Sequence, residues 1–211
     1  MPQPSIARIE RGTVVPRTTT LVAILEATGH RLAVETSGPP VDREAIRRRL
    51  ALDATKRTWQ ALGRPARNRR TSPIHILRRL RFFGVPFVLI GELAEAAHGA
   101  PGKLGRVIEV CHGATDVAEA RLAAALQDLE ATTSGGSSFK TDAGRLHLLT
   151  ETAAGDDYDV LMRNAQWMFV APGTRVRVAA LDDLIRIRRA GSKPEDRAAE
   201  AVLLAIGDIT L

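Results

Sequence analysis

The chain has 211 residues, of which 45% are hydrophobic, enough for one full domain with a packed core and a smaller unit. Its single cysteine, Cys111, excludes an intrachain disulfide and a thiolate metal cluster, and its apolar neighbours predict a buried thiol. No apolar run reaches the roughly 18 residues of a membrane span, and residues 1–12 lack an apolar signal-peptide core. We therefore expect a cytoplasmic protein without a membrane partner.

Positive charge is concentrated in the first part of the chain. Residues 1–83 hold 17 lysines and arginines against 6 acidic residues, whereas residues 84–211 hold 13 against 18. A basic part joined to an acidic part predicts a polyanion partner at one end, and nucleic acid is the polyanion that we expect. The alternative is that the arginines form an ordinary solvated helix face.

Helices are predicted through most of the first 83 residues. Apolar residues at helical spacing, with capping residues or closing glycines, mark helices at residues 3–12, 18–29, 42–62 and 74–83. Between them, residues 32–35 are expected to be extended, and residues 36–40 and 63–73 to be linkers. The arginines expected to neutralise phosphates are Arg47, Arg48, Arg49, Arg64, Arg67, Arg69 and Arg70.

From residue 84 onward, short apolar runs alternate with amphipathic segments. Strands are predicted at residues 85–90, 106–111, 145–150, 157–161, 167–170 and 175–179. Helices are predicted at residues 92–98, 116–131, 181–190 and 195–204, and a Ser/Gly loop at residues 132–138. The sequence therefore predicts an α+β fold.

One motif lies near the start of the chain. The run Q-P-S-I-A-R-I-E-R-G from Gln3 to Gly12 is followed at spaced positions by Pro16, Thr20, Leu21, Leu25 and Gly29. These residues resemble the second half of a Cro/C1-type (Xre) helix-turn-helix domain, in which this pattern is the recognition helix and the turn after it. The resemblance implies a DNA partner, with base or phosphate contacts from Gln3, Ser5, Arg8, Arg11 and Arg17.

That family has two helices before this point, whereas Gln3 is the third residue here. Either the coding sequence begins further upstream, or the unit is a remnant that binds DNA weakly. An ordinary helical hairpin is the alternative to both.

Four phrases carry a second resemblance. They are G-V-P-F-V-L-I-G-E-L-A-E-A-A-H-G from Gly84, G-R-L-H-L-L from Gly144, V-A-A-L-D-D-L-I-R-I-R-R-A from Val178, and K-P-E-D from Lys193. In this order they resemble small nucleotidyltransferase-like domains related to AbiEii-type toxins and minimal nucleotidyltransferases. The resemblance implies a nucleotidyltransferase-like mixed β-sheet flanked by helices at residues 74–211. It would follow a partial helix-turn-helix unit at residues 1–36 and a basic helical linker at residues 37–73.

The acidic positions of that family are altered in this sequence. There, a strand leads into G-G or G-S and a helix, the next strand carries D-x-D, and a later strand carries a third aspartate. The carboxylates hold Mg²⁺ against the triphosphate. Here the two D-x-D positions align with Arg106 and Ile108, or after a shift by one with Val107 and Glu109, and the third aligns with His147. The altered pattern predicts no catalytic residue, no metal and no cofactor.

Three residues still match the family's phosphate-facing positions. The resemblance implies low-affinity phosphate or nucleotide contacts from Gly91, Arg188 and Lys193, although Glu92 places a negative charge beside Gly91. Arg188 and Lys193 are equally explained as helix-end charges.

Other polar residues of this domain have simpler explanations. Asp156, Asp157 and Asp159 are expected in a solvated turn, with a metal site as the alternative. His98 is expected to pack at a helix end, and His112 to lie on a loop surface.

Three functional hypotheses remain. The first is a DNA-binding transcriptional regulator or antitoxin-like protein, whose catalytically degenerate transferase-like domain serves homodimerisation or ligand sensing. The second is a nucleotidyltransferase toxin with an atypical active site, built on Glu109 and the acidic residues at 156–159. The third is a protein-interaction module without either activity.

Overall fold

The computed structural model describes residues 17–29, 40–63 and 72–210, and the chain divides into two compact units, Met1–Ser37 and Gly38–Leu211. In the first unit, helix α2 (Thr18–Ala27) confirms the helix predicted from residue 18. Its last carbonyls accept hydrogen bonds from the Thr28 hydroxyl, and Gly29 closes the turn with a φ of 76°. The helix predicted at residues 3–12 and the extended segment at 32–35 lie outside the described residues.

Within the described part of the second unit, seven strands form one mixed sheet in the order β3-β4-β5-β2-β1-β7-β6. The strands are β1 (Phe87–Ile90), β2 (Val107–His112), β3 (Thr132–Gly135), β4 (Ser138–Thr141), β5 (Gly144–Leu149), β6 (Gln166–Ala171) and β7 (Thr174–Val178). Strand β1 runs antiparallel to β2 and parallel to β7, and β2 runs parallel to β5. The predicted α+β fold with a mixed sheet is confirmed.

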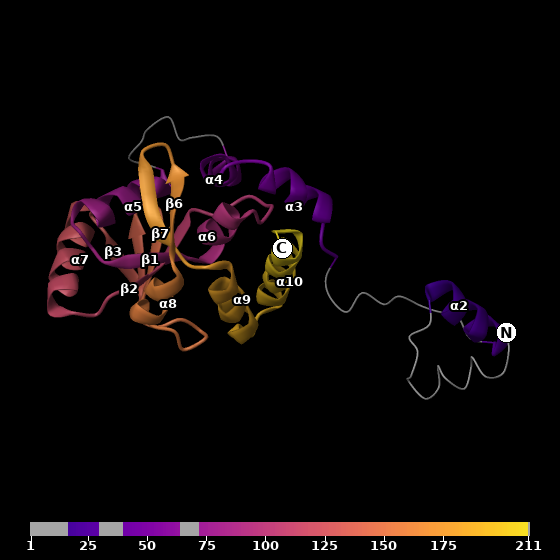
Figure 1. The fold of residues 1–211 in the computed structure, drawn as a ribbon. Coiled ribbons are helices and arrows are strands. Elements are labelled where there is room, and N and C mark those ends of the chain that lie inside the picture. Colours follow the sequence, from indigo (N-terminus) through magenta and orange to yellow (C-terminus); the bar gives the residue numbers. More distant parts are fainter. Residues whose placement is uncertain (1–16, 30–39, 64–71, 211) are drawn as a thin grey trace. The chain divides into compact units, whose positions relative to one another are not determined.

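Helices flank this sheet. They are α3 (Arg43–Leu50), α4 (Ala54–Leu62), α5 (Pro73–Phe82), α6 (Gly91–His98), α7 (Asp116–Asp128), α8 (Tyr158–Asn164), α9 (Leu181–Ala190) and α10 (Pro194–Thr210). In Figure 1, α7 lies to the left of the strands, and α9 and α10 lie to the right. No helix among the described residues has the length and apolar character that a membrane crossing requires.

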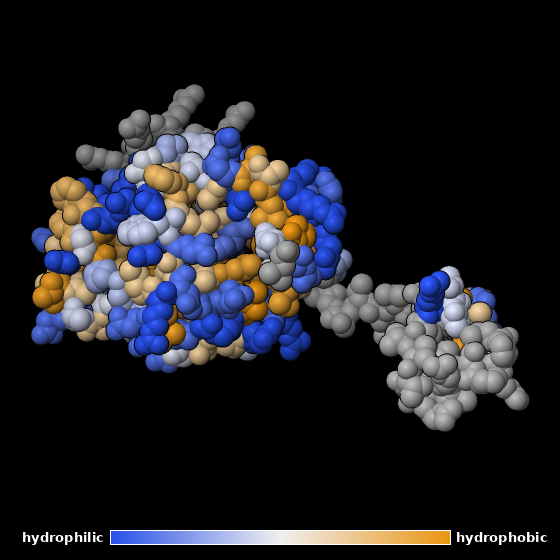
Figure 2. Space-filling view, viewed as in Figure 1, coloured by the Kyte–Doolittle hydropathy of each residue, from blue (hydrophilic) through white to orange (hydrophobic). Residues whose placement is uncertain are grey.

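The core is built from the inward faces of the strands and helices. Leu89, Ile108 and Leu146 come from three adjacent strands, and Leu80 and Leu184 come from helices on the sheet. Each such burial stabilises the fold by about 1.5–3 kcal/mol relative to an exposed side chain. Cys111 is buried among them, as predicted. On the visible face of the second unit, hydrophobic residues are interspersed with hydrophilic ones, so this face has no broad apolar area (Figure 2).

The segment predicted as one basic helix at residues 42–62 is two helices. The Asp53 carboxylate accepts a hydrogen bond from the Lys56 amide (2.9 Å) and so begins α4 anew. Both helices pack on the second unit, with Ile46, Thr58 and Ala61 buried, so they belong to this unit rather than to a linker. The Thr58 hydroxyl donates to the Val170 carbonyl (2.6 Å), so α4 partly covers the outer edge of β6.

Three local predictions are wrong. Residues 132–138 do not form a simple loop, because β3 and β4 pair there as a hairpin. Residues 157–161 form the start of α8 instead of a strand, because the Asp157 carboxylate accepts a hydrogen bond from the Val160 amide (2.9 Å) and begins a helix. His112 lies at the end of β2 and is buried rather than on a loop surface.

Candidate functional site

Gly91 stands at the junction of β1 and α6, where the family of the second resemblance approaches phosphate. Its φ is +68°, a left-handed conformation that favours glycine. A Cβ placed on Gly91 would overlap the Glu109 carboxylate. The space beside the glycine backbone is therefore filled by a carboxylate of the same chain.

The sheet register brings Glu109 and His147 together. Glu109 lies opposite Ile90 on β1 and opposite His147 on β5. The His147 Nδ1 atom is 3.3 Å from the Glu109 Oε1 atom, and both side chains are about one-third exposed. The two groups form a hydrogen bond when the His147 Nδ1 atom carries a proton that it donates to the Glu109 carboxylate.

The same register determines which side chains of the two alternative D-x-D alignments face Gly91. Ile108 is buried in the core, so its side chain faces away from Gly91. Arg106 lies just before β2, where its guanidinium donates to the Asp142 carbonyl (3.1 Å). Because side chains alternate along a strand, Val107 and Glu109 are the residues that share the face toward Gly91. Of the two alignments, only the shifted one, on Val107 and Glu109, has its residues on the face toward Gly91.

Arg188 reaches the same region from α9, but two carboxylates hold it. Its Nε atom donates to Glu95 Oε1 (2.6 Å), and its Nη1 atom donates to Asp196 Oδ1 (2.8 Å). Glu95 is only 7% exposed, and burial raises its pKa while the hydrogen bond from Arg188 opposes that shift. Burial alone would lower the pKa of Arg188, but its bonds to the two carboxylates raise that pKa above its ordinary value. Arg188 is therefore a permanently charged, internally neutralised group.

Lys193 lies outside this cluster. Its backbone amide donates to the Asp196 carboxylate (3.2 Å) just before α10, and its side chain is exposed. The structure thus brings Gly91 and Arg188 into one region and leaves the Lys193 side chain at the surface. The sequence does not indicate that Glu95 is the partner of Arg188, because no local signal joins residues 93 positions apart.

A pocket of about 280 Å³ opens beside this cluster. Its charged lining residues are Glu92, Glu95, Lys103, Arg188 and Glu195. Three carboxylates against two cations make a poor environment for a polyphosphate. The acidic lining agrees with the position of Glu109 against Gly91.

The residues do not fit the Mg²⁺ site of the family. One carboxylate, Glu109, and one imidazole, His147, face the Gly91 junction, whereas that chemistry needs two or three oxygen ligands. In the part of the chain that the structure describes, no three His, Cys, Asp or Glu side chains are grouped so as to hold a metal ion. The acidic residues at 156–159 likewise form no such group. Asp156 binds Arg186 (2.8 Å), and Asp157 begins α8.

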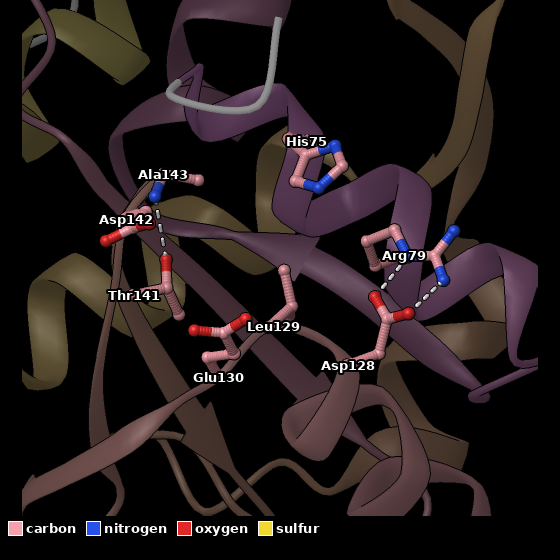
Figure 3. Close-up of a pocket in the computed structure, with 8 residues that line it drawn as sticks. All are labelled: His75, Arg79, Asp128, Leu129, Glu130, Thr141, Asp142 and Ala143. Carbon is pink, nitrogen blue, oxygen red and sulfur yellow. Dashed lines mark hydrogen bonds and ion pairs between the residues drawn. The ribbon is translucent and has the colours of Figure 1, made fainter.

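A second pocket lies near α5, the end of α7 and the β4–β5 turn (Figure 3). There the Arg79 guanidinium binds the Asp128 carboxylate with two nitrogens. Glu130 and Asp142 also line the pocket, so acidic groups outnumber the one arginine. None of the residues predicted from either resemblance lies in it.

The predicted DNA-contact residues are mostly outside the described part of the chain. Gln3, Ser5, Arg8 and Arg11 fall within residues 1–16. Arg17 is described, and it lies exposed immediately before α2.

The chain matches no protein-family model, and no curated protein shows significant similarity to it.

Proposed function

We propose that this protein is a DNA-binding transcriptional regulator or antitoxin-like protein, whose residues 74–211 form a nucleotidyltransferase-like domain without transfer activity. One observation carries the catalytic part of this proposal. The Glu109 carboxylate fills the space beside Gly91 and bonds His147, at the place where the family holds Mg²⁺ and phosphate.

The strand order supports the resemblance itself. A strand ends at Gly91, a helix follows, and the next strand and a later one bring Glu109 and His147 side by side. These are the places at which the family carries its glycine and its acids. This order of strands agrees with what the resemblance implies and so supports the proposal, while the chemistry of the side chains differs.

The altered side chains oppose phosphoryl chemistry in two ways. Glu109 would be the one carboxylate at these strand positions to hold a magnesium ion, whereas the family carries two or three there. In addition, Arg188 would have to break two short bonds, to Glu95 and Asp196, before it could bind a phosphate. Both changes remove interactions that stabilise the transition state of phosphoryl transfer.

The DNA-binding part of the proposal rests on charge and on the first resemblance. Arg47 and Arg48 on α3 are well exposed, and within the described residues their one ion-pair partner is Glu44, at 3.9 and 3.8 Å. Such exposed pairs are weak, so both guanidinium groups can contact phosphates. Arg49 differs, because it donates to the carbonyls of Arg57 and Gly102 and is used inside the fold.

Incubation with labelled nucleoside triphosphates tests the catalytic part. The purified chain, with Mg²⁺ or Mn²⁺ and mixed RNA and protein acceptors, is expected to transfer no label. Glu109→Ala removes the acid whose carboxylate lies against Gly91, and Glu119→Ala removes an exposed acid on α7 as the matched control.

Label transfer that disappears in Glu109→Ala and persists in Glu119→Ala would contradict the proposal. It would instead establish the toxin-enzyme hypothesis with Glu109 as a metal ligand.

A further inference from the structure

The hairpin of β6 and β7 presents two exposed aromatic rings. Trp167 and Phe169 on β6 are 47% and 50% exposed, and β6 is one of the two edge strands of the sheet (Figure 1). Because the two residues are two apart, their rings stand on one face of the strand. Their cross-strand partners on β7 are Arg177 and Arg175.

The two arginines stack on these rings. The Arg177 guanidinium carbon lies 4.7 Å from the centre of the Trp167 ring. The Arg175 guanidinium carbon lies 5.4 Å from the Trp167 ring and 5.7 Å from the Phe169 ring. Flat cations and flat rings therefore alternate over an exposed sheet face, which we call the Trp–Arg face: Trp167, Phe169, Arg175 and Arg177.

The positive charge here is not neutralised by carboxylates. Among the described residues, Arg175, Arg177 and the nearby Arg81 have no ion-pair partner, whereas Arg186, Arg188 and Arg189 each bind an acid. The Arg177 Nη1 atom donates to the Ala165 carbonyl (2.9 Å), whereas its buried Nε atom has no hydrogen-bond partner in the described part of the chain.

A pocket of about 210 Å³ adjoins the Trp–Arg face. Arg81, Tyr158, Trp167 and Arg177 line it, and no carboxylate does. Burial raises the pKa of Tyr158, and the charge of Asp159 adds to that shift. Arg177 opposes that shift. The charge of this pocket is thus opposite to that of the pocket beside Gly91.

We propose that the Trp–Arg face binds a single-stranded nucleic acid, with bases stacked on Trp167 and Phe169 and phosphates beside Arg81, Arg175 and Arg177. Exposed rings flanked by arginines are the features by which proteins hold unpaired bases and their backbone. Two rings on alternate residues are about 6.6 Å apart along a strand. That spacing is about twice the roughly 3.4 Å rise of a stacked duplex strand, so each ring can take one splayed base.

The test uses the full chain and a fluorescein-labelled oligothymidylate of about 12 nucleotides, within the site sizes known for stacking surfaces. Fluorescence anisotropy gives the affinity. In a Trp59→Phe background, Trp167 is the one remaining tryptophan of the chain, and binding is expected to quench its fluorescence. Trp167→Ala is expected to weaken binding by roughly 5- to 150-fold, which corresponds to the loss of one base stack.

Two variants serve as controls, and a third variant tests the contribution of positive charge. Trp167→Tyr keeps a stacking ring and should retain most of the affinity, and circular dichroism checks that each variant is folded. Trp59→Ala removes an exposed tryptophan from a different pocket and should leave the affinity within about twofold, a change of less than 0.5 kcal/mol. Arg175→Gln should reduce the salt dependence of binding.

Three results would overturn the proposal. The first is no binding of the oligothymidylate at low salt. The second is an equal affinity of Trp167→Ala and the unchanged chain. The third is Trp167 quenching by free nucleoside triphosphate but not by the oligothymidylate.

Discussion

At the scale of single residues, the backbone conformation of Gly91 and its contact with Glu109 explain why a glycine stands at this position. Its left-handed backbone disfavours a Cβ, and the adjacent Glu109 carboxylate occupies the place where a Cβ would stand. A glycine that looks like a phosphate-binding residue in the sequence is thus also needed for internal packing. The role of this glycine can be tested without any ligand.

We predict that Gly91→Ala lowers the free energy of unfolding by about 2–4 kcal/mol, from backbone strain together with overlap on Glu109. Gly173→Ala is the matched control, because Gly173 has a similar φ of +69° and nothing within 4 Å of a Cβ. It should cost only the strain of about 1–2 kcal/mol. Urea denaturation measures both.

The double variant Gly91→Ala/Glu109→Ala isolates the overlap. It should recover the part of the loss that exceeds the Gly173→Ala value, since the two changed residues are in contact. Equal losses in Gly91→Ala and Gly173→Ala would mean that the Glu109 carboxylate does not occupy this space.

At the scale of secondary-structure elements, Arg57 on α4 joins three helices. Its guanidinium donates to the carbonyls of Leu50 and Leu52 near the end of α3 and to that of Ala97 on α6. A cation near helix C-termini also interacts favourably with the helix dipoles. Arg57 therefore stabilises the fold, although it is one of the basic residues at positions 1–83 from which a polyanion partner was predicted.

We predict that Arg57→Met lowers the free energy of unfolding by about 1.5–3 kcal/mol, because several carbonyls lose a charged donor. Lys56→Met is the control, since Lys56 is exposed and pairs only with Asp53 (3.3 Å) among the described residues. Its cost should stay below about 1 kcal/mol. Thermal and urea unfolding of the two variants would contradict this account if they showed equal losses.

The elements differ in how well the sequence predicts them. Buried strands such as β1 and β5 have unbroken or alternating apolar runs, and these runs predict the strands directly from the sequence. The hairpin of β3 and β4 was missed because β3 is exposed and rich in Thr, Ser and Gly, so it has no apolar pattern. In α8, alternating apolar residues suggested a strand, whereas the Asp157 cap favours a helix.

At the scale of the whole molecule, pairing between distant strands determines the candidate site. Glu109 and His147 are 38 residues apart, and only the parallel register of β2 and β5 makes them neighbours. The resemblance implies a site built from these segments, and a shift of one residue along β2 changes which side chains would face Gly91. Sequence alone cannot settle such a shift, because alternate residues of β2 differ mainly in which face they occupy.

The molecule has two positively charged surfaces in different places. Arg47 and Arg48 belong to the basic first part of the chain, whereas the Trp–Arg face lies at the outer strand β6 and its neighbour β7. Binding of duplex DNA and of single strands should therefore respond to different substitutions.

The central claim, that this protein binds DNA, is tested most directly by duplex binding of the full chain over a salt series of about 50–200 mM. We predict a linear fall of the logarithm of the binding constant with the logarithm of salt concentration. The double variant Arg47→Gln/Arg48→Gln should reduce that slope by about 2, from two lost phosphate contacts, whereas Trp167→Ala should leave it unchanged. Absence of binding at the lowest salt concentration would contradict the claim.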